Sequence, residues 1–464
     1  MTLSAEQPIE QVLYQFLQSL ELTERPIVIA YSGGIDSQVL LHSAVTLLRQ
    51  KRLKSSLKVI HVNHGLSANA DSWQQFCQQQ SAQYHVPFSG YKVEIDVHGK
   101  ESIEALARDA RYKVFMEQSE PNAVILTGHH QDDQVETFLL ALKRGAGVQG
   151  LGAMQSLRRL DNDKNLTLAR PLLSLSREQI ESYARRQQLA WIEDESNADE
   201  RFDRNFIRAQ VIPLLTQRWP GISQTISRSA RHCQQAHKLI RQQASDDLAY
   251  CLNEDSSLSI KSLCQIPPNR QPQVLRQFVN EYVGQPPSTK QLEELVTACF
   301  DAKVDKNPQI KLAGAIIRRY QSNLYITKAF MDVGGWQWQH QFDQSFTSQS
   351  IVLPDGLGRL TLTKVNREAV TLAPNQWQVS LPSIQQQIKL GFEHTNPKCL
   401  PAYRNKRREL KKIFQELNVP TWQRKRSPIL FFDDRVVSVL PLFVCKEYLI
   451  DQNKECLLVS WDQD

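Results

Sequence analysis

The feature that most limits the fold is a regular alternation of short apolar runs and longer amphipathic stretches over residues 1–150. β-Branched runs predict strands at 27–31, 58–62, 88–95 and 123–127. The periodicity between and after them predicts helices at 39–48, 72–84, 103–118 and 132–143. Strands and helices that alternate at this spacing form βαβ units. We therefore expect residues 1–215 to form an α/β domain, with a parallel sheet and helices on both of its faces. Residues 189–192 are a candidate for a further strand.

The rest of the chain changes character along its length. A helical pattern rich in Gln and Arg predicts a connecting helix at 216–248, followed by a helical middle domain at 249–333. The polar, aromatic segment 334–352 has the composition of a junction. Short strands then return at 360–365, 377–381, 429–432 and 436–440, which predicts a small α+β domain over 351–464.

Composition excludes several classes of protein. The chain has 464 residues, of which 41% are hydrophobic and 22% charged, as in ordinary globular proteins. It contains no apolar run long enough to span a bilayer, and its polar start does not have the order of a secretory signal, so we expect a cytoplasmic protein without a membrane partner. The eight cysteines are scattered without a CxxC pair, which predicts reduced structural thiols.

The strongest motif directly follows the first predicted strand and opens a helix. Its two glycines permit positive φ values and a close approach of the backbone to a bound anion. The helix N-terminus then directs N–H groups at that anion, and the carboxylate of Asp36 could hold a Mg²⁺ ion that bridges phosphates. The pattern is neither the Walker loop nor the dinucleotide fingerprint. The nucleotide-binding residues that we expect are Ser32, Gly33, Gly34, Ile35, Asp36 and Ser37.

This hexapeptide resembles the PP-loop of the N-type ATP pyrophosphatases, which cleave ATP between the α- and β-phosphates. The resemblance implies an adenine nucleotide alpha hydrolase-like fold. Further segments resemble motifs of the tRNA(Ile)-lysidine synthetase family, and the set spans residues 27–208. They are HVNHGL at 61–66, GHHQDDQVET at 128–137, RGAGVQGL at 144–151, RPLL at 170–173, and DESNADERFDRNFIR at 194–208.

Membership of that family implies a particular reaction. ATP adenylates the C2 oxygen of the wobble cytidine in an isoleucine tRNA with a CAU anticodon, and the ε-amine of free L-lysine then displaces AMP. The products are lysidine, AMP and pyrophosphate, and the tRNA changes from reading AUG to reading AUA. The resemblance therefore implies ATP and Mg²⁺ as cofactors and tRNA(Ile) and lysine as substrates.

Two carboxylates are candidates for the binding of lysine. Asp133 and Glu136 are i,i+3 neighbours on one predicted helix face, near the phosphate loop. They could bind lysine or a metal, and a nearby carboxylate or His could assist the loss of the proton from the amine. The alternative is that they are helix-start acids stabilised by the helix dipole. His129, at the end of the preceding strand, is our candidate for contact with phosphate or base, whereas His61 and His64 fit packing better.

Basic and amide side chains supply the other candidates. Arg108 and Arg111 match an ARxxRY segment of the family and could clamp phosphate or base, or lie on a solvated helix face. A loop that holds the tRNA or the adenylate is expected to include Asn197, Arg204, Asn205 and Arg208.

A basic segment near the C-terminus is the candidate RNA surface. Residues 404–426 contain nine Lys or Arg and two Glu, although the net charge of the chain is only +6. The segment resembles the last domain of the longer bacterial family members, with Thr421 where a second proline is common. Phosphate contact and base stacking are one interpretation, and a solvated charged face is the other. The proposed tRNA-binding residues are Lys411, Lys412, Trp422, Arg424, Lys425 and Arg426.

Three other functions compete with lysidine synthesis. A PP-loop tRNA thiolase would need cysteines for a sulfur relay or a cluster, and the sequence has no such pair. A small-molecule ligase, such as an NAD or GMP synthetase, would not need two appended domains with a basic, aromatic segment. An RNA-binding protein without catalysis would not need the intact Asp36, Ser37, Asp133 and Glu136. The sequence leaves the oligomeric state open, a homodimer included.

Overall fold

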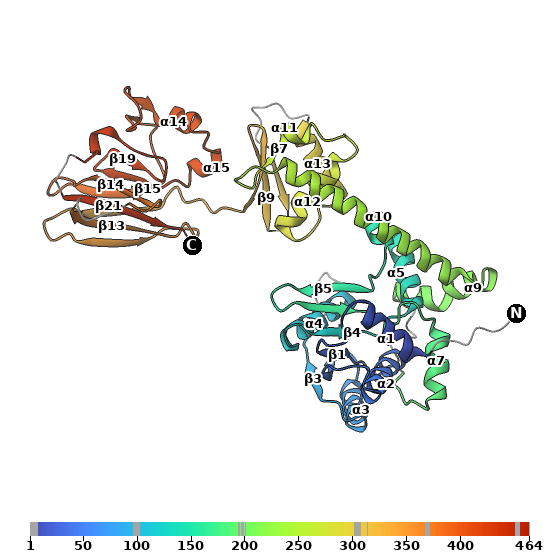
Figure 1. Ribbon diagram of the computed structural model, residues 1–464. Coiled ribbons are helices and arrows are strands. Elements are labelled where there is room, and N and C mark those ends of the chain that lie inside the picture. The colour runs from blue at the N-terminus through green and yellow to red at the C-terminus, as the bar shows by residue number, and fades with distance from the viewer. Residues whose placement is uncertain are drawn as a thin grey trace. The chain divides into compact units, whose positions relative to one another are not determined.

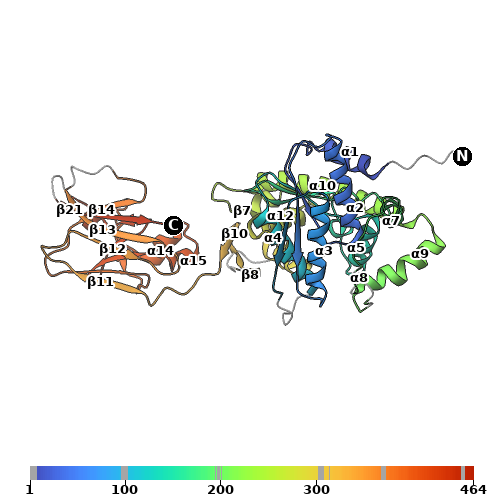
Figure 2. The ribbon, with the colours of Figure 1, turned by 90° about the horizontal axis from the view of Figure 1, so that it is seen from below.

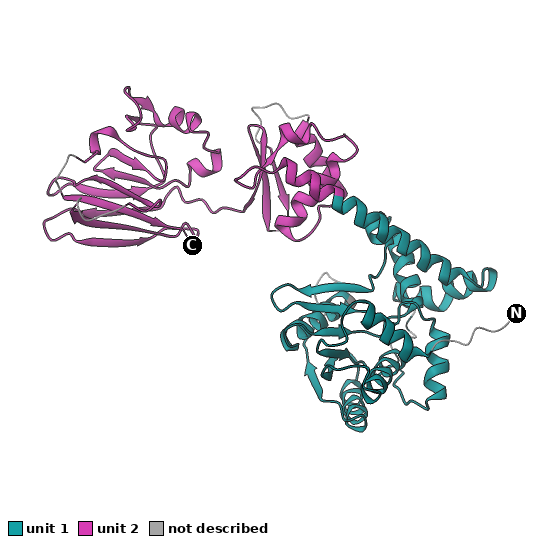
Figure 3. Cartoon of the chain, viewed as in Figure 1, with its two compact units in different colours: residues 1–242 teal, residues 243–464 magenta. Residues whose placement is uncertain are grey.

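The structure is a computed structural model that describes residues 8–95, 103–193, 195, 199, 201–300, 308–312, 314–366, 372–450 and 455–463 (Figure 1). The chain forms two compact units, residues 1–242 and 243–464 (Figure 3). The boundary falls within the long helix α10 (Ile222–Cys251), at the place where a connecting helix was expected.

A six-stranded sheet organises the first unit. Its strands are β1 (Ile27–Ala30), β2 (Leu57–Asn63), β3 (Phe88–Lys92), β4 (Val124–Leu126), β5 (Leu157–Asp161) and β6 (Leu166–Ala169). They lie in the order β3-β2-β1-β4-β6-β5, and every neighbouring pair is parallel except β5 with β6. The four strands predicted from the sequence are therefore confirmed, as is the parallel sheet.

Helices cover both faces of this sheet. They are α1 (Ile9–Ser19), α2 (Ile35–Arg49), α3 (Ala70–Gln83), α4 (Ile103–Gln118), α5 (Gln131–Lys143) and α7 (Arg177–Arg186), while the short helix α6 (Val148–Leu151) contacts α5 and buries none of its residues. Successive side chains of a strand point to opposite faces. Ile27 and Ile29 of β1 accordingly join one core with residues of α1, α2 and α7, whereas Val28 joins a second core with Phe115 of α4.

The edge of the sheet differs from our prediction. Residues 189–192 do not form a strand, and the sheet is completed by the hairpin β5–β6, which we did not predict. Leu189 packs against the larger core from an irregular segment. An apolar run can be buried as a loop as well as a strand, and its own sequence does not separate the two.

We had expected a helical middle domain, but the middle region of the chain also contains a sheet. Its helices are α11 (Ile260–Leu263), α12 (Gln271–Val283) and α13 (Thr289–Phe300). They share a core with a four-stranded sheet, ordered β7 (Leu258–Ser259), β10 (Asn323–Lys328), β9 (Ala315–Tyr320) and β8 (Gln309–Leu312). Two buried arginines, Arg318 and Arg319, interrupt the apolar pattern of β9 and conceal its strand character. Arg319 is satisfied there by a 2.7 Å bond from Nη1 to the carbonyl of Ala298.

In the described part of the C-terminal region two larger sheets lie beside a two-stranded one, β16 (Lys398–Cys399) with β17 (Arg408–Glu409) (Figure 2). One larger sheet contains β11 (Gln337–Gln341), β15 (Gln387–Gly391), β18 (Ile429–Phe432), β19 (Arg435–Val439) and β20 (Phe443–Val444). The other contains β12 (Ser348–Val352), β13 (Arg359–Asn366), β21 (Glu455–Asp462) and β14 (Gln376–Ser380). Side chains from both larger sheets form one core. The short helices beside them are α14 (Leu410–Glu416) and α15 (Thr421–Arg424).

The expected junction at 334–352 belongs to this C-terminal fold. β11 pairs with β15 and β12 pairs with β13, so the domain begins well before residue 351. Val333, Phe342 and Phe346 are buried in its core. The polar residues of 337–341 obscured the strand, because only alternate side chains of an edge strand face the core.

Two findings bear on the wider properties of the chain. Within the described ranges, no helix combines the length and the apolar character needed to cross a membrane. All eight cysteines are free thiols among the described residues, and six of them are buried.

Candidate active site

The candidate site lies where the connections of the sheet reverse direction. β1 is flanked by β2 on one side and β4 on the other, and all three strands are parallel. In such sheets ligands bind beyond the carboxyl ends of the strands, at the point where the strand order reverses. The hexapeptide 32–37 follows β1 and residues 127–130 follow β4, so the topology brings the two strongest motifs to the same edge.

Gly33 gives the phosphate loop its shape. Its φ of +84° lies in the left-handed region that non-glycine residues avoid. A Cβ atom at this position would lie 2.8 Å from Cδ1 of Ile192 and 3.0 Å from Sγ of Cys77. The carbonyl of Gly33 also accepts a 2.9 Å bond from the backbone N–H of Ile192. Any side chain here would therefore be strained by the backbone conformation and would press against the side chains of Ile192 and Cys77.

The loop leads into the first turn of α2 without a side-chain cap. Gly34 is the N-cap and has no side chain that could accept bonds from the first-turn amides. Those amides have no carbonyl partner within the helix and carry the positive end of its dipole. The buried hydroxyl of Ser37 donates to the carbonyl of Gly34 at 2.9 Å and lies 3.2 Å from the hydroxyl of the exposed Ser32. Ile35 is buried and anchors the turn in the core. This arrangement suits an anion such as a phosphate.

Gly128 allows the segment after β4 to press against that same turn. A Cβ on Gly128 would lie 2.8 Å from the carbonyl carbon of Asp36 and 3.0 Å from the backbone nitrogen of Ser37. Both are backbone atoms, which cannot move aside cheaply. The close approach explains how residues of α5 come within reach of the phosphate loop.

Asp36 faces two cationic or potentially cationic side chains. Nη1 of Arg177 lies 3.0 Å from each of its carboxylate oxygens, and Nε2 of His130 lies 3.7 Å from Oδ1. Burial raises the pKa of Asp36 above its usual value, against the opposing effects of His130 and Arg177. We did not predict Arg177 or His130 from the sequence. The pattern Ser176-x-x-Gln179, a capping box at the start of α7, was the signal that could have placed Arg177 at a helix start.

The two predicted acids of α5 lie side by side in an ion-pair cluster. The carboxylate of Glu136 has no exposed surface and accepts bonds from Nε of Arg204 at 2.7 Å and Nε of Arg208 at 2.6 Å. Asp133 accepts a 2.9 Å bond from the N–H of His130, as part of the capping box of α5. Arg204 and Arg208 also lie 3.7 and 3.6 Å from Asp133. Burial opposes the ionisation of Asp133, but the neighbouring histidines, Arg204 and the N–H bond together lower its pKa.

The two histidines after β4 have different environments. His130 is buried and its Nδ1 accepts a 3.2 Å bond from the N–H of Asp132, as the N-cap of α5. Nδ1 of His129 lies 2.8 Å from the hydroxyl of Thr127. Burial and the nearby arginines lower the pKa of His129 to about 3, against the effect of Asp133, so its imidazole is neutral near pH 7. His130, not His129, is the histidine that lies closest to Asp36.

β2 and the residue that follows it contribute a further pair of histidines, His61 and His64. Nδ1 of His61 lies 2.9 Å from the carbonyl of Tyr31, next to the phosphate loop, which is the packing role expected from the sequence. The Nδ1 atom of His64 is buried and has no hydrogen-bond partner among the described residues. Burial, with Arg111 and His61, lowers the pKa of His64 to about 4. A buried polar atom without a partner is unusual in proteins and fits a site for a polar ligand.

α4 presents its predicted arginines at this same region. Arg108 and Arg111 are both exposed, and Arg108 lies over the ring of Tyr112 at 5.5 Å. Arg111 is close enough to lower the pKa values of His61, His64 and His129. It therefore lies beside the site, whereas the contact of Arg108 is with its own helix.

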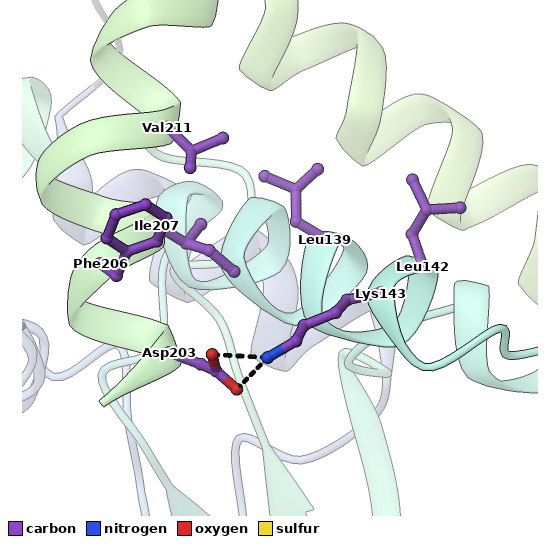
Figure 4. A pocket seen from close by; sticks show the side chains of 7 residues that line it. All are labelled: Leu139, Leu142, Lys143, Asp203, Phe206, Ile207 and Val211. Carbon is purple, nitrogen blue, oxygen red and sulfur yellow. Dashed lines mark hydrogen bonds and ion pairs between the residues drawn. The ribbon is translucent and has the colours of Figure 1, made fainter. Parts of the chain in front are cut away.

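A groove lies beside α5. It has a volume of about 420 Å³ and lies between α5 and the segment formed by α8 (Asp203–Phe206) and the π-helical turn η2 (Ile207–Val211) (Figure 4). A salt bridge of 2.6 Å joins Lys143 to Asp203 across it. Its lining residues are Leu139, Leu142, Lys143, Asp203, Phe206, Ile207 and Val211.

The remaining residues of the predicted loop have separate outcomes. Nδ2 of Asn205 donates a 3.0 Å bond to the carbonyl of Asp199, and so braces the segment that carries Arg204 and Arg208. Asn197 lies outside the described residues.

The C-terminal basic segment splits into exposed and internally bonded residues. Lys411, Lys412 and Lys425 are exposed. Arg426 is 8% exposed and lies 2.6 Å from the carboxylate of Asp355. Arg424 donates to the carbonyl of Val419 at 2.8 Å and to the hydroxyl of Tyr320 at 3.2 Å.

Trp422 is half-buried against the sheet of the middle region. Its ring packs edge-on against Tyr320 and Tyr325, with centroids 6.1 and 5.3 Å apart, and lies 5.6 Å from the guanidinium of Arg318. These protein side chains occupy part of the surface of the ring. These contacts favour a structural role for Trp422 over the stacking of a base.

Comparison with known proteins agrees with these observations. Residues 5–215 match a family described as PP-loop domain, residues 258–325 match the TilS substrate binding domain, and residues 388–461 match the TilS substrate C-terminal domain. The chain is 41% identical over 421 residues to the tRNA(Ile)-lysidine synthase of Actinobacillus pleuropneumoniae serotype 3 (strain JL03), which covers 90% of this chain and 96% of that relative. It belongs to the tRNA(Ile)-lysidine synthase family.

Other similar proteins extend the comparison. The tRNA(Ile)-lysidine synthase of Vibrio parahaemolyticus serotype O3:K6 is 39% identical over 456 residues, or 97% of this chain and 99% of the relative. Among solved structures, a U34-tRNA thiolase from Methanococcus maripaludis is 16% identical, with a TM-score of 0.40 over 48% of this chain and 76% of its own. A TilS C-terminal domain is 17% identical, with a TM-score of 0.22 over 28% of this chain and 98% of its own.

Proposed function

We propose that this chain ligates free L-lysine to C2 of the wobble cytidine of an isoleucine tRNA with a CAU anticodon, at the expense of ATP. The cytidine C2 oxygen attacks the α-phosphorus and pyrophosphate leaves. The lysine ε-amine then attacks C2, loses a proton, and AMP departs with the original oxygen. The product is lysidine, and the tRNA would read AUA in place of AUG. The supporting observation is that the PP-loop meets the acidic and basic cluster of α5 and α8 at one edge of the sheet.

The loop residues are proposed to bind the triphosphate. The uncapped first turn of α2 and the hydroxyls of Ser32 and Ser37 offer donors to phosphate oxygens. The buried, unpaired Nδ1 atom of the partly exposed His64 and the nearby Arg111 offer polar contacts for the rest of the nucleotide or the base. These features fit ATP better than an uncharged ligand, because the helix N-terminus favours negative charge.

Asp36 is the residue that we propose for Mg²⁺. The described residues contain no group of three or more His, Cys, Asp or Glu that could hold a metal by themselves. This fits Mg²⁺, which commonly takes one or two carboxylates and completes its shell with water and substrate phosphates. When bound, the ion would neutralise charge on the phosphates that leave as pyrophosphate. Asp36 must release Arg177 to serve in this role, since both carboxylate oxygens contact that guanidinium.

The α5 acids divide into two proposed roles. Asp133 keeps 13% of its side-chain surface exposed and has a lowered pKa, so it is an ionised acceptor suited to an ammonium group of lysine. Glu136 is saturated by Arg204 and Arg208, and we propose that it positions these arginines. The arginines can then contact the phosphate of the adenylate or the tRNA. The neutral imidazole of His129 can exchange hydrogen bonds with phosphate or base, but with a pKa of about 3 it is too weak a base to take up the proton that the amine loses.

The tRNA is proposed to contact the exposed lysines of the C-terminal region. Lys411, Lys412 and Lys425 retain this role, whereas Arg424, Arg426 and Trp422 are engaged by protein and are better assigned to structure. A substrate of this class places the reaction in the cytoplasm. Light scattering of the purified chain, alone and with tRNA, would test whether it forms a homodimer.

The direct test is mass spectrometry of tRNA(Ile) after incubation with the chain, ATP, Mg²⁺ and isotopically labelled lysine. We expect incorporation of one lysine, together with release of AMP and pyrophosphate. Asp36→Ala should abolish pyrophosphate release and leave tRNA binding nearly unchanged. Release of ADP and orthophosphate, or release that does not depend on tRNA and lysine, would reject the proposed function.

A further inference from the structure

We infer that Arg177 is a ligand of the ATP triphosphate and is held on Asp36 until the nucleotide binds. The inference deepens the proposed function and rests on it. Arg177 is the first residue of α7, and the preceding Ser176 caps that helix by accepting a 3.3 Å bond from the N–H of Gln179. Its starting position is therefore fixed by a helix end, and its side chain extends from there to the phosphate loop.

The guanidinium is aimed by two carboxylates. Nε of Arg177 lies 2.9 Å from Oε1 of Glu181, one turn further along α7, and Nη1 lies 3.0 Å from both oxygens of Asp36. Glu181 can keep its bond to Nε while the two terminal nitrogens turn to a different acceptor. The side chain is 40% exposed, so such a movement needs no opening of the core.

Asp36 places this guanidinium at the end of α2 that would receive an anion. It is the second residue of α2, directly after the two glycines. The amides that bind phosphate in such loops belong to the same helical turn. The guanidinium of Arg177 therefore lies at the helix end where the phosphates are expected. A guanidinium can donate two parallel hydrogen bonds to phosphate oxygens.

The charges around the phosphate loop favour transfer of the Arg177 guanidinium from Asp36 to the phosphates. Asp36 and Asp133 already place negative charge beside the loop, and a triphosphate adds several more. If Asp36 turned its oxygens to a Mg²⁺ ion, Arg177 would keep Glu181 but lose its contact with Asp36, and the phosphates would be strong acceptors for its terminal nitrogens. In the proposed reaction AMP is transferred to the cytidine and pyrophosphate leaves, so the guanidinium would contact the β- or γ-phosphate, which belongs to the leaving pyrophosphate.

The test measures binding and not turnover. Isothermal titration would compare a non-cleavable α,β-methylene analogue of ATP, with Mg²⁺, and AMP as ligands of the full-length chain. We expect Arg177→Ala to weaken binding of the analogue by about 10- to 100-fold, since a charge-assisted phosphate contact is lost. Binding of AMP should change by less than about 3-fold, and Arg177→Lys should recover part of the loss as a point charge.

Arg185→Ala is the matched control. Arg185 lies on the same helix, is 74% exposed, and contacts the same Glu181 at 3.4 Å, so its removal changes the charge of α7 equally. This variant should bind both ligands as the wild type does. The inference is overturned if Arg177→Ala binds the analogue as tightly as the wild type or more tightly, or if it loses AMP and the analogue equally. A wild-type chain that binds neither ligand would reject the proposed function itself, whatever the variants do.

Discussion

Replacing Glu136 with Gln tests whether this acid holds the arginine cluster together. The carboxylate is wholly buried and accepts three bonds, at 2.6 and 3.2 Å from Arg208 and 2.7 Å from Arg204. Gln keeps the volume but removes the charge and one acceptor. The two guanidinium groups would then face each other across a neutral side chain.

The magnitude follows from the exposure of the partners. A hydrogen bond between charged groups contributes about 1.5–3 kcal/mol, and three such bonds would sum to more than the loss that we expect. The side chains of Arg204 and Arg208 are 26% and 41% exposed, so both regain water when released. We therefore expect a loss of about 2–4 kcal/mol in the free energy of unfolding. For a unit of this size that is a fall of roughly 5–12 °C in melting temperature.

The assay is differential scanning fluorimetry and calorimetry of the full-length chain, with Asp203→Asn as the control. Asp203 pairs with Lys143 at 2.6 Å on the same α8 segment, but its side chain is 62% exposed, and exposed pairs contribute little. The control should lower the melting temperature by no more than a few degrees. If Glu136→Gln melts no lower than Asp203→Asn, the carboxylate does not organise the cluster and our assignment of Glu136 as a positioning residue is wrong.

Three further changes test other parts of the site. Gly128→Ala should destabilise the chain by about 1–3 kcal/mol and weaken nucleotide binding, because the new Cβ would lie 2.8 Å from the α2 backbone. An unchanged melting temperature and an unchanged nucleotide affinity would contradict that close approach. His129 is neutral in the folded chain, with a pKa of about 3, while an unfolded histidine takes up a proton near pH 6.5, so acid favours unfolding below pH 6.5 by at most about 1.4 kcal/mol per pH unit. His129→Asn should therefore reduce the fall in melting temperature between pH 6.5 and 5, and the same fall as in the wild type would show that this histidine is not responsible. The third change replaces the exposed Lys411, Lys412 and Lys425 together with Ala. It should weaken tRNA binding and reduce the slope of log affinity against log salt concentration by up to about three, because phosphate contacts are lost. An unchanged slope would mean that the segment is an ordinary solvated surface.

Several features of the fold could be predicted from the sequence because they depend on local rules. The alternation of β-branched and amphipathic segments gave the parallel strands β1 to β4, and the double glycine after the first strand marked the phosphate loop. The hairpin β5–β6 and the sheet of the middle region were missed. In β9 two arginines are buried by partners distant in sequence, so the strand has no recognisable apolar pattern of its own.

The sequence by itself determined the helix N-terminus that suits phosphate and the i,i+3 placement of Asp133 and Glu136, since both follow from backbone geometry over a few residues. Only the tertiary structure decided which charges meet. Glu136 is saturated by arginines about 70 residues away, Asp36 by Arg177, and Arg426 by Asp355. Burial and ion pairing depend on contacts between distant segments, and these contacts determine whether a charged side chain is free to bind a substrate or is already bound within the protein.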